Sequence, residues 1–411
     1  MMHFVNDGLF YAIFFVIPLA ALEFDLSFTQ ASLIKTFFSL FSSLLQYPCA
    51  LLTGSVSDLS LLALGTGWVG LGMVVMGLST GIWPLWISTI GAGMGGSAQH
   101  PVASSLVSRL FSQTRRGSAI GTLNFGGDVG KAAFAGIMSF LLLYLNWRQT
   151  LYVVGLGAAI FSIGWYWISR GLARPSAVTD SEGDISCQPR PQMNHENSDP
   201  PATSTVEPPP GRNQRRRFVV ISAIGMLDNS TRSTLLTFLP FLYLAKGMGK
   251  EHLGVYLTLV ATGGLFGKLG CGIVADYIGN VGMIVVTEVL TASLILLCLM
   301  SDPTTGLVVA AFLGFFLNGT SSVIYSQAAG VIPVSIRTQG YGAFFTFTLG
   351  AAATTPLLFG LLGDFFQTRY DEWSGLMAIF VGMTAMTAVT IPLAATFWGL
   401  GRHRPNSRSL S

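Results

Sequence analysis

The chain has 411 residues, of which 51% are hydrophobic and only 10% are charged, and its formal net charge is +3. Soluble domains carry about 25% charged residues, so the composition excludes an ordinary soluble protein and indicates a polytopic membrane protein. A net charge this small is not that of a nucleic-acid-binding protein, and the 48 glycines fit closely packed membrane helices.

Apolar stretches long enough to cross about 30 Å of hydrocarbon occur twelve times, six on each side of a polar segment. The expected fold is therefore an all-α polytopic membrane protein with twelve transmembrane helices in two six-helix bundles. The expected spans are 3–23, 30–53, 61–80, 83–106, 117–143 and 148–169 before the polar segment, and 218–243, 252–275, 281–300, 306–332, 340–363 and 374–398 after it.

The polar segment, 171–217, holds eight of the chain's 18 prolines and 12 of its 41 charged residues. A packed core cannot form from this composition, which predicts a disordered or extended linker. The linker ends in a cluster of arginines just before Phe218. The expected organisation is a six-helix bundle over 1–170, the linker over 171–217, a second six-helix bundle over 218–398 and a tail over 399–411.

The distribution of Lys and Arg predicts the orientation in the membrane. If both termini lie on the linker's side, 14 of the 22 Lys and Arg fall on that side, four fall on the opposite side and four fall within spans. Positive residues accumulate on the cytoplasmic side of membrane proteins. We therefore expect a cytoplasmic linker, cytoplasmic termini and a location in the plasma (inner) membrane. No basic segment precedes the first apolar run, so we expect no cleavable signal peptide.

The two halves show an internal repeat. The first span carries Asn6-Asp7 followed by Pro18, and the first span after the linker carries Asp228-Asn229 followed by Pro240. The second spans also end alike, in Gly-x3-Asp motifs that close at Asp58 and at Asp276. Such a repeat is typical of a duplicated six-helix transporter.

These features resemble the major facilitator superfamily over essentially the whole chain. Four motifs are further similar to its fosmidomycin-resistance efflux type, namely His3-Phe-Val-Asn6-Asp7, Ser43-Leu-Leu-Gln46-Tyr-Pro48, Gly96-Ser-Ala-Gln-His100-Pro101 and Asn124-Phe-Gly-Gly127-Asp-Val-Gly130. The resemblance implies two bundles that rock about a site at the membrane midplane. It also implies a monomer that exchanges a small molecule across the lipid bilayer, with protons as the driving ion.

The chain departs from the superfamily at its cytoplasmic gate. There the Gly-x3-Asp loops usually continue with a glycine and two basic residues, which neither loop has here. We therefore expect a different gate, in which Asp58 or Asp276 pairs with Arg115, Arg116 or Arg337.

Charged residues within the spans are costly, so each is a candidate for function. Asp7, beside Asn6, is expected to carry the coupling proton; alternatively, it is a helix-end aspartate in contact with cytoplasmic water. Asp228 and Arg232, beside Asn229, are spaced i,i+4 and are expected to pair on one helix face. The pair either opens to bind an anion and a proton or only lowers the cost of insertion.

Two further candidates lie in the first half. Asp128 and Lys131 are spaced i,i+3, so they share a face and either neutralise each other or face the charged pair of the seventh span across a cavity. His100 is expected either to relay a proton near neutral pH or to act as a hydrogen-bonded packing residue.

Three charged residues of the spans are not assigned to substrate. Lys35 is close enough to the outer face to extend its amine to water. Lys268 is expected to pair with groups at the cytoplasmic end, and Glu288 lies on the ninth span, which usually supports the bundle from outside.

The sequence shows no nucleotide-binding loop, metal cluster or hydrolytic triad, so we expect neither an enzyme nor a bound cofactor. The first hypothesis is proton-coupled export of a small amphiphilic or anionic compound. The second is proton-driven uptake of an organic anion, which the buried basic groups favour. A third is a transporter-like receptor in which the linker is the signalling element.

Overall fold

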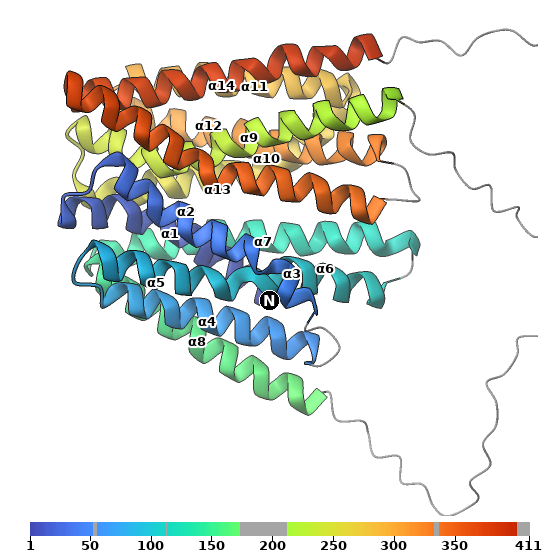
Figure 1. Cartoon of the computed structure of the whole chain (residues 1–411), viewed down its shortest axis with the longest axis horizontal. Coiled ribbons are helices and arrows are strands. Elements are labelled where there is room, and N and C mark those ends of the chain that lie inside the picture. Colours follow the sequence, from blue (N-terminus) through green and yellow to red (C-terminus); the bar gives the residue numbers. More distant parts are fainter. Residues whose placement is uncertain (52–55, 112, 173–211, 333–336, 401–411) are drawn as a thin grey trace, which may run out of the picture.

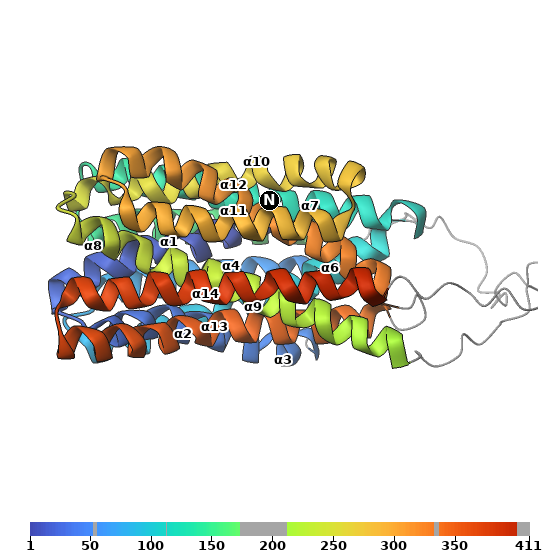
Figure 2. The same ribbon diagram turned by 90° about the horizontal axis from the view of Figure 1, so that it is seen from above.

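The computed structural model describes residues 1–51, 56–111, 113–172, 212–332 and 337–400. The described chain is helical, and its helices run side by side along one axis in both views (Figures 1 and 2). The first half contains α1 (Met2–Phe24), α2 (Phe28–Leu44), α3 (Gln46–Leu51), α4 (Asp58–Gly77), α5 (Ile82–Gly95), α6 (Gln99–Leu110), α7 (Gln113–Leu142) and α8 (Trp147–Leu172). The second half contains α9 (Arg212–Ala245), α10 (Leu253–Ile278), α11 (Asn280–Met300), α12 (Pro303–Val331), α13 (Arg337–Arg369) and α14 (Glu372–Leu400).

These helices form twelve membrane-crossing elements, six in each half, which confirms the predicted fold. Nine of the described helices are long and apolar enough to cross a membrane unaided. Two of the other elements are interrupted: α2 gives way to α3 at Leu45, and a 3-10 turn over Gly96–Ala98 separates α5 from α6. Pro48 and Pro101 lie just beyond these breaks and lack the backbone N–H that a continuous helix needs.

The outer surface of the bundle is apolar. Many large hydrophobic side chains are exposed, among them Trp68, Ile87, Ile160, Phe312 and Leu358. A soluble monomer rarely exposes so much contiguous apolar area. Lipid is therefore the solvent that this surface fits.

The boundary between the linker and the second bundle differs from the prediction. α9 begins at Arg212, so the arginines at 212, 215, 216 and 217 form its first turns and do not end an extended segment. Arginine is a good helix former, and the three prolines at 208–210, which would disrupt a helix, come just before the observed start. α8 likewise continues to Leu172.

We call the end of the bundle where α8 stops and α9 starts the linker end, and the opposite end the distal end (Figure 1). The two halves contact each other closely toward the distal end. The Asp364 carboxylate of α13 accepts hydrogen bonds from Ser27 Oγ at 2.6 Å, from the Phe28 N–H at 2.8 Å and from the Thr29 N–H at 3.0 Å. A carboxylate is stabilised there because a helix N-terminus has free N–H groups and a positive dipole end. Asp364 thus joins α13 of one half to the start of α2 in the other.

Candidate functional site

A cluster of charged side chains lies where α1, α7 and α10 meet. Lys131 Nζ of α7 is 3.2 Å from Asp7 Oδ2 of α1 and 3.0 Å from Asp128 Oδ1. Lys268 Nζ of α10 is 2.5 Å from Asp128 Oδ2, and His3 Nδ1 lies 3.8 Å from Asp7 Oδ1. We call these five residues the central cluster. Two lysines, whose side chains are 37% and 26% exposed, neutralise two buried aspartates in it.

The spacing of the charged residues on α7 and a glycine on the same helix bring the charges of the cluster together. Asp128 and Lys131 are i,i+3 on α7 and therefore share one face. Gly127 lies against α1 so closely that a Cβ there would sit 2.6 Å from Asp7 Oδ2 and 3.0 Å from His3 Nε2. The absence of a side chain at this glycine lets α1 and α7 approach until their charges meet.

The central cluster joins the two halves of the molecule. Asp128 belongs to the first half and Lys268 to the second, and their ion pair crosses the interface. The sequence analysis expected Lys268 to pair with groups at the cytoplasmic end, and this expectation was wrong. Lys268 is the 16th residue of the 26-residue α10, and it reaches sideways to α7.

Asp228 and Arg232 form the pair predicted from their i,i+4 spacing. Arg232 Nη2 lies 2.6 Å from Asp228 Oδ2 and also donates to the Leu317 carbonyl at 3.1 Å, while Nη1 donates to Asn229 Oδ1 at 3.1 Å. Asp228 is only 3% exposed.

Asp128 and Lys131 contact each other and the rest of the central cluster. Their distance of 3.0 Å is the one expected if the two charges neutralise each other.

A small cavity of about 20 Å³ lies beside the central cluster. This volume is room for about one water molecule. The Tyr11 hydroxyl donates to the Leu257 carbonyl of the other half at 2.9 Å, a further contact between the halves. The cavity is lined by Tyr11, Asp128, Lys131, Ala261, Gly264, Leu265, Lys268 and Asn318.

The remaining sequence candidates lie around the cluster or outside it. His100 is exposed, and its ring meets the His3 ring edge-on with 5.2 Å between centroids. Asn6 is 1% exposed, and neither of its amide atoms has a hydrogen-bond partner within the described part of the chain. The sequence analysis did not assign His3 or Lys268 to the site. The i,i+4 spacing of His3 and Asp7 was an available signal for the first, whereas no local spacing links Lys268 to α7.

The predicted gate is only partly within the described structure. Asp58 begins α4, and Asp276 is exposed near the end of α10. The side chains of Arg115, Arg116 and Arg337 lie outside the described residues, so pairing at this gate stays a prediction.

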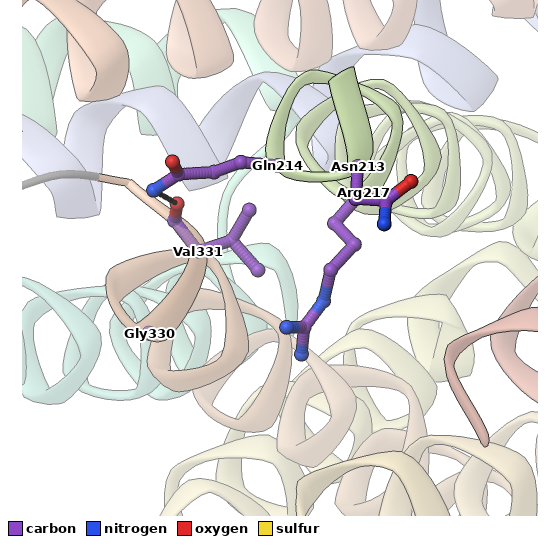
Figure 3. Close-up of a pocket in the computed structure, with 5 residues that line it drawn as sticks. All are labelled: Asn213, Gln214, Arg217, Gly330 and Val331. Carbon is purple, nitrogen blue, oxygen red and sulfur yellow. Dashed lines mark hydrogen bonds between the residues drawn. The ribbon is translucent and has the colours of Figure 1, made fainter. Parts of the chain in front are cut away.

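A second pocket, of about 250 Å³, opens at the linker end between the start of α9 and the end of α12 (Figure 3). Gln214 Nε2 donates to the Val331 carbonyl at 3.1 Å across one side, and the Arg217 guanidinium lies 5.7 Å from the Phe397 ring centroid. Its lining residues are Asn213, Gln214, Arg217, Gly330 and Val331. This pocket lies within the second half, so it does not share the central cluster's position between the halves.

Comparison with known families decides the identity of the fold. A model of the Major Facilitator Superfamily matches residues 1–227 and again residues 218–410. The chain belongs to the major facilitator superfamily. Proteins of this family are membrane transporters, and the two matches agree with the internal repeat and with the resemblance predicted from the sequence.

Relatives of this transporter have several named substrates. It is 26% identical to the fosmidomycin resistance protein of Escherichia coli (strain K12) over 368 residues, 88% of this chain and 84% of that protein. It is 24% identical to the D-galactonate transporter of Escherichia coli O6:H1 over 314 residues, 72% of each chain. A match of 26% identity to the probable L-galactonate transporter of Escherichia coli (strain K12) covers 36% of this chain and only 33% of that protein.

Solved transporters share the fold. A bacterial homologue of the human lysosomal transporter Spinster, in an inward-facing and unoccupied conformation, has a TM-score of 0.71 at 15% identity and covers 98% of this chain and 95% of its own. The nucleoside transporter NupG has a TM-score of 0.70 at 10% identity, with 98% of both chains covered. At these identities the likeness shows the fold alone.

Proposed function

We propose that this protein is a secondary active transporter that moves a small organic anion together with a proton by alternating access. The observation that carries the proposal is the position of Asp128 between two lysines from opposite halves. Lys131 and Lys268 both bind its carboxylate, and the cavity of the interface lies beside them.

The charges of the central cluster explain why proton and anion would move together. A substrate carboxylate has the same charge and shape as the Asp128 side chain, so it can take that place between the lysines once Asp128 accepts a proton. An anion without the proton would add an uncompensated negative charge to a partly enclosed site between the two halves, which is unfavourable. Anion and proton therefore bind as a pair, and the site stays neutral when loaded and when empty.

The same exchange would couple binding to movement of the halves. The Asp128–Lys268 ion pair ties α7 to α10 across the interface. Protonation of Asp128 removes this tie, and the anion replaces it in the loaded state. A ligand that changes contacts between the halves shifts the balance between their conformations.

The named substrates of relatives support the class of compound. Galactonate, galactarate and glucarate, which appear in the names of related transporters, are sugar acids with one or two carboxylates. A pair of lysines within the spans suits such anions.

Export by exchange with protons is the second candidate. It is favoured by the match to the fosmidomycin resistance protein, which extends over 88% of this chain. In an exchanger the proton and the substrate compete for the site, whereas in the cotransport mechanism each requires the other.

We also propose an orientation with the linker and both termini in the cytoplasm, a location in the inner membrane and a monomeric state. The 14 to 4 distribution of Lys and Arg supports the orientation.

Ligand-dependent thermal stability of the purified protein tests the proposal directly. D-galactonate, D-glucarate and unrelated organic acids are titrated at several pH values between 5 and 8. If one proton binds with the anion, the Kd falls about tenfold for each unit by which the pH is lowered while Asp128 is ionised in the empty protein. Asp128→Asn removes this dependence. Tighter anion binding at higher pH would contradict cotransport, and would favour the exchanger.

A further inference from the structure

Four carboxylates are buried in the described part of the chain, and one of them differs from the others. Asp7, Asp128 and Asp228 each lie within 3.2 Å of a lysine or arginine nitrogen. Glu288 of α11 is only 2% exposed, yet it forms no ion pair within 4.0 Å among the described residues. Its Oε1 atom also has no hydrogen-bond partner there.

The surroundings of Glu288 hold few charges. The Thr390 hydroxyl of α14 donates to the Thr387 carbonyl at 2.6 Å, and the charges that act on Glu288 electrostatically are Asp228 and Arg232 of α9. Among the described helices packed on α11, α12 has no charged side chain, and the single acid of α14, Glu372, is its exposed first residue. α10 carries Lys268, which pairs with Asp128 of the central cluster, and Asp276, which is exposed. A carboxylate enclosed in this way without a cation does not keep its charge and instead holds a proton.

Arg232 has a donor that complements Glu288. Its Nη atoms donate hydrogen bonds to Asp228, Asn229 and the Leu317 carbonyl. Its Nε is buried and has no partner within the described structure. The unpartnered donor of Arg232 and the unpartnered acceptor of Glu288 thus belong to two groups that interact electrostatically. Asp228, Glu288 and Arg232 together are neutral when the two carboxyl groups hold one proton.

We propose that Glu288, Asp228 and Arg232 form a proton-binding site in which Arg232 alternates between the two carboxylates. In the observed arrangement Arg232 pairs with Asp228 and the proton is on Glu288. When Arg232 turns to Glu288, the O–H bond of Glu288 breaks and an O–H bond forms on Asp228. One positive charge, one negative charge and one proton are present before and after the step.

The position of Asp228 gives this exchange a direction. Asp228 interacts electrostatically with Lys268 of the central cluster, whereas Glu288 lies on α11. Arg232 in turn is influenced by Tyr325 of α12 and by Asp128. The exchange therefore brings a proton from the enclosed side of α9 toward the proposed anion site. This inference rests on the proposed proton coupling and names a residue that stores the proton.

Infrared spectroscopy of the full-length protein in lipid tests the proton on Glu288 without any substrate. At pH 7 we expect a carbonyl band of a protonated carboxyl group that disappears in Glu288→Gln and persists in Glu372→Gln, which changes an exposed acid. Glu288→Asp, which keeps the titratable group, retains a shifted band. A spectrum that does not change in Glu288→Gln would overturn the inference.

Transport by reconstituted protein tests whether this proton moves. With labelled D-galactonate as probe, Glu288→Gln is expected to lose at least tenfold in accumulation driven by a pH gradient while retaining counterflow within about twofold. Full accumulation by Glu288→Gln would overturn the inference, as would a requirement for Na⁺ in place of the proton gradient. Failure of the wild type to move D-galactonate would count against the proposed substrate class alone, because the infrared experiment still decides whether Glu288 holds a proton.

Discussion

The two halves of the transporter begin with similar helices but hold their acids differently. α1 carries Asn6-Asp7 and α9 carries Asp228-Asn229, and each helix contains a proline further along. In the first half, the base that neutralises Asp7 comes from another helix, and the ion network continues into the second half. In the second half, Asp228 is neutralised by Arg232 on the same helix.

This difference separates a contact that movement of the two halves must change from one that this movement can leave intact. The Asp128–Lys268 pair crosses the interface, so movement of one half against the other stretches or breaks it. The Asp228–Arg232 pair lies one turn apart on a single helix and moves with it as a unit. The central cluster is therefore suited to sense substrate and conformation, and the pair on α9 is suited to exchange a proton with Glu288 without movement of one half against the other.

Loss of Lys131 should have the largest effect. Lys131→Met removes the cation that Asp7 and Asp128 share, which leaves Asp7 without a lysine and Asp128 with Lys268 alone. We expect transport of labelled organic acid in cells to fall at least about a hundredfold at equal protein level. Lys35→Met is the matched control, because Lys35 contacts Ser39 and the Phe14 ring and, among the described residues, forms no ion pair with a carboxylate. Transport by Lys131→Met at the rate of the control would contradict the role of the cluster.

The pair across the interface should show strong coupling. Lys268→Gln and Asp128→Asn are each expected to reduce transport more than tenfold, and the double variant should lose little more than either one. Residues that act through one ion pair deviate from additivity by about 0.5–3 kcal/mol. The four transport rates of the double-mutant cycle measure this energy. Independent, additive losses would mean that the Asp128–Lys268 pair does not act as a unit.

The pair within α9 should affect proton coupling more than substrate exchange. Asp228→Asn removes a proton acceptor but leaves the central cluster intact, so we expect loss of pH-driven accumulation by about tenfold and counterflow within about threefold of the wild type. Asp371→Asn, which changes an exposed acid between α13 and α14, is the control. Full pH-dependent accumulation by Asp228→Asn would remove this acid from the mechanism.

The distal contact should have the smallest effect. Asp364→Asn weakens the hydrogen bonds to the start of α2, and helix caps of this kind are worth about 0.5–2 kcal/mol. We expect a several-fold faster reaction of an impermeant maleimide with a cysteine at Ala261, which lines the central cavity, in a background without the four native cysteines. An unchanged rate would show that Asp364 does not hold the distal end closed.

Local spacing accounts for what the sequence predicted correctly. The twelve spans follow from hydropathy, and the pairs Asp128–Lys131 and Asp228–Arg232 follow from the i,i+3 and i,i+4 geometry of a helix. These relationships are fixed within one element. Neither requires knowledge of how the helices pack.

The contacts that the sequence did not reveal depend on the packing of separate helices. The partner of Lys268 depends on the rotation of α10 against α7, and the partners of Asp364 depend on the position of α13 beside α2. A single sequence leaves both free. The isolation of Glu288 was equally hidden, because α11 was expected to support the bundle from outside, and burial from neighbouring helices is visible only in three dimensions.

The central claim, that an anion and a proton occupy the cluster together, is tested most directly with a pH dye sealed inside proteoliposomes. Labelled D-galactonate, D-glucarate and other organic acids are added outside, with wild type and Asp128→Asn run in parallel. The account predicts that uptake of a transported acid acidifies the interior, and that Asp128→Asn abolishes the acidification. Uptake with no pH change, or with a rise in internal pH, would contradict cotransport; a rise in internal pH would identify an exchanger instead.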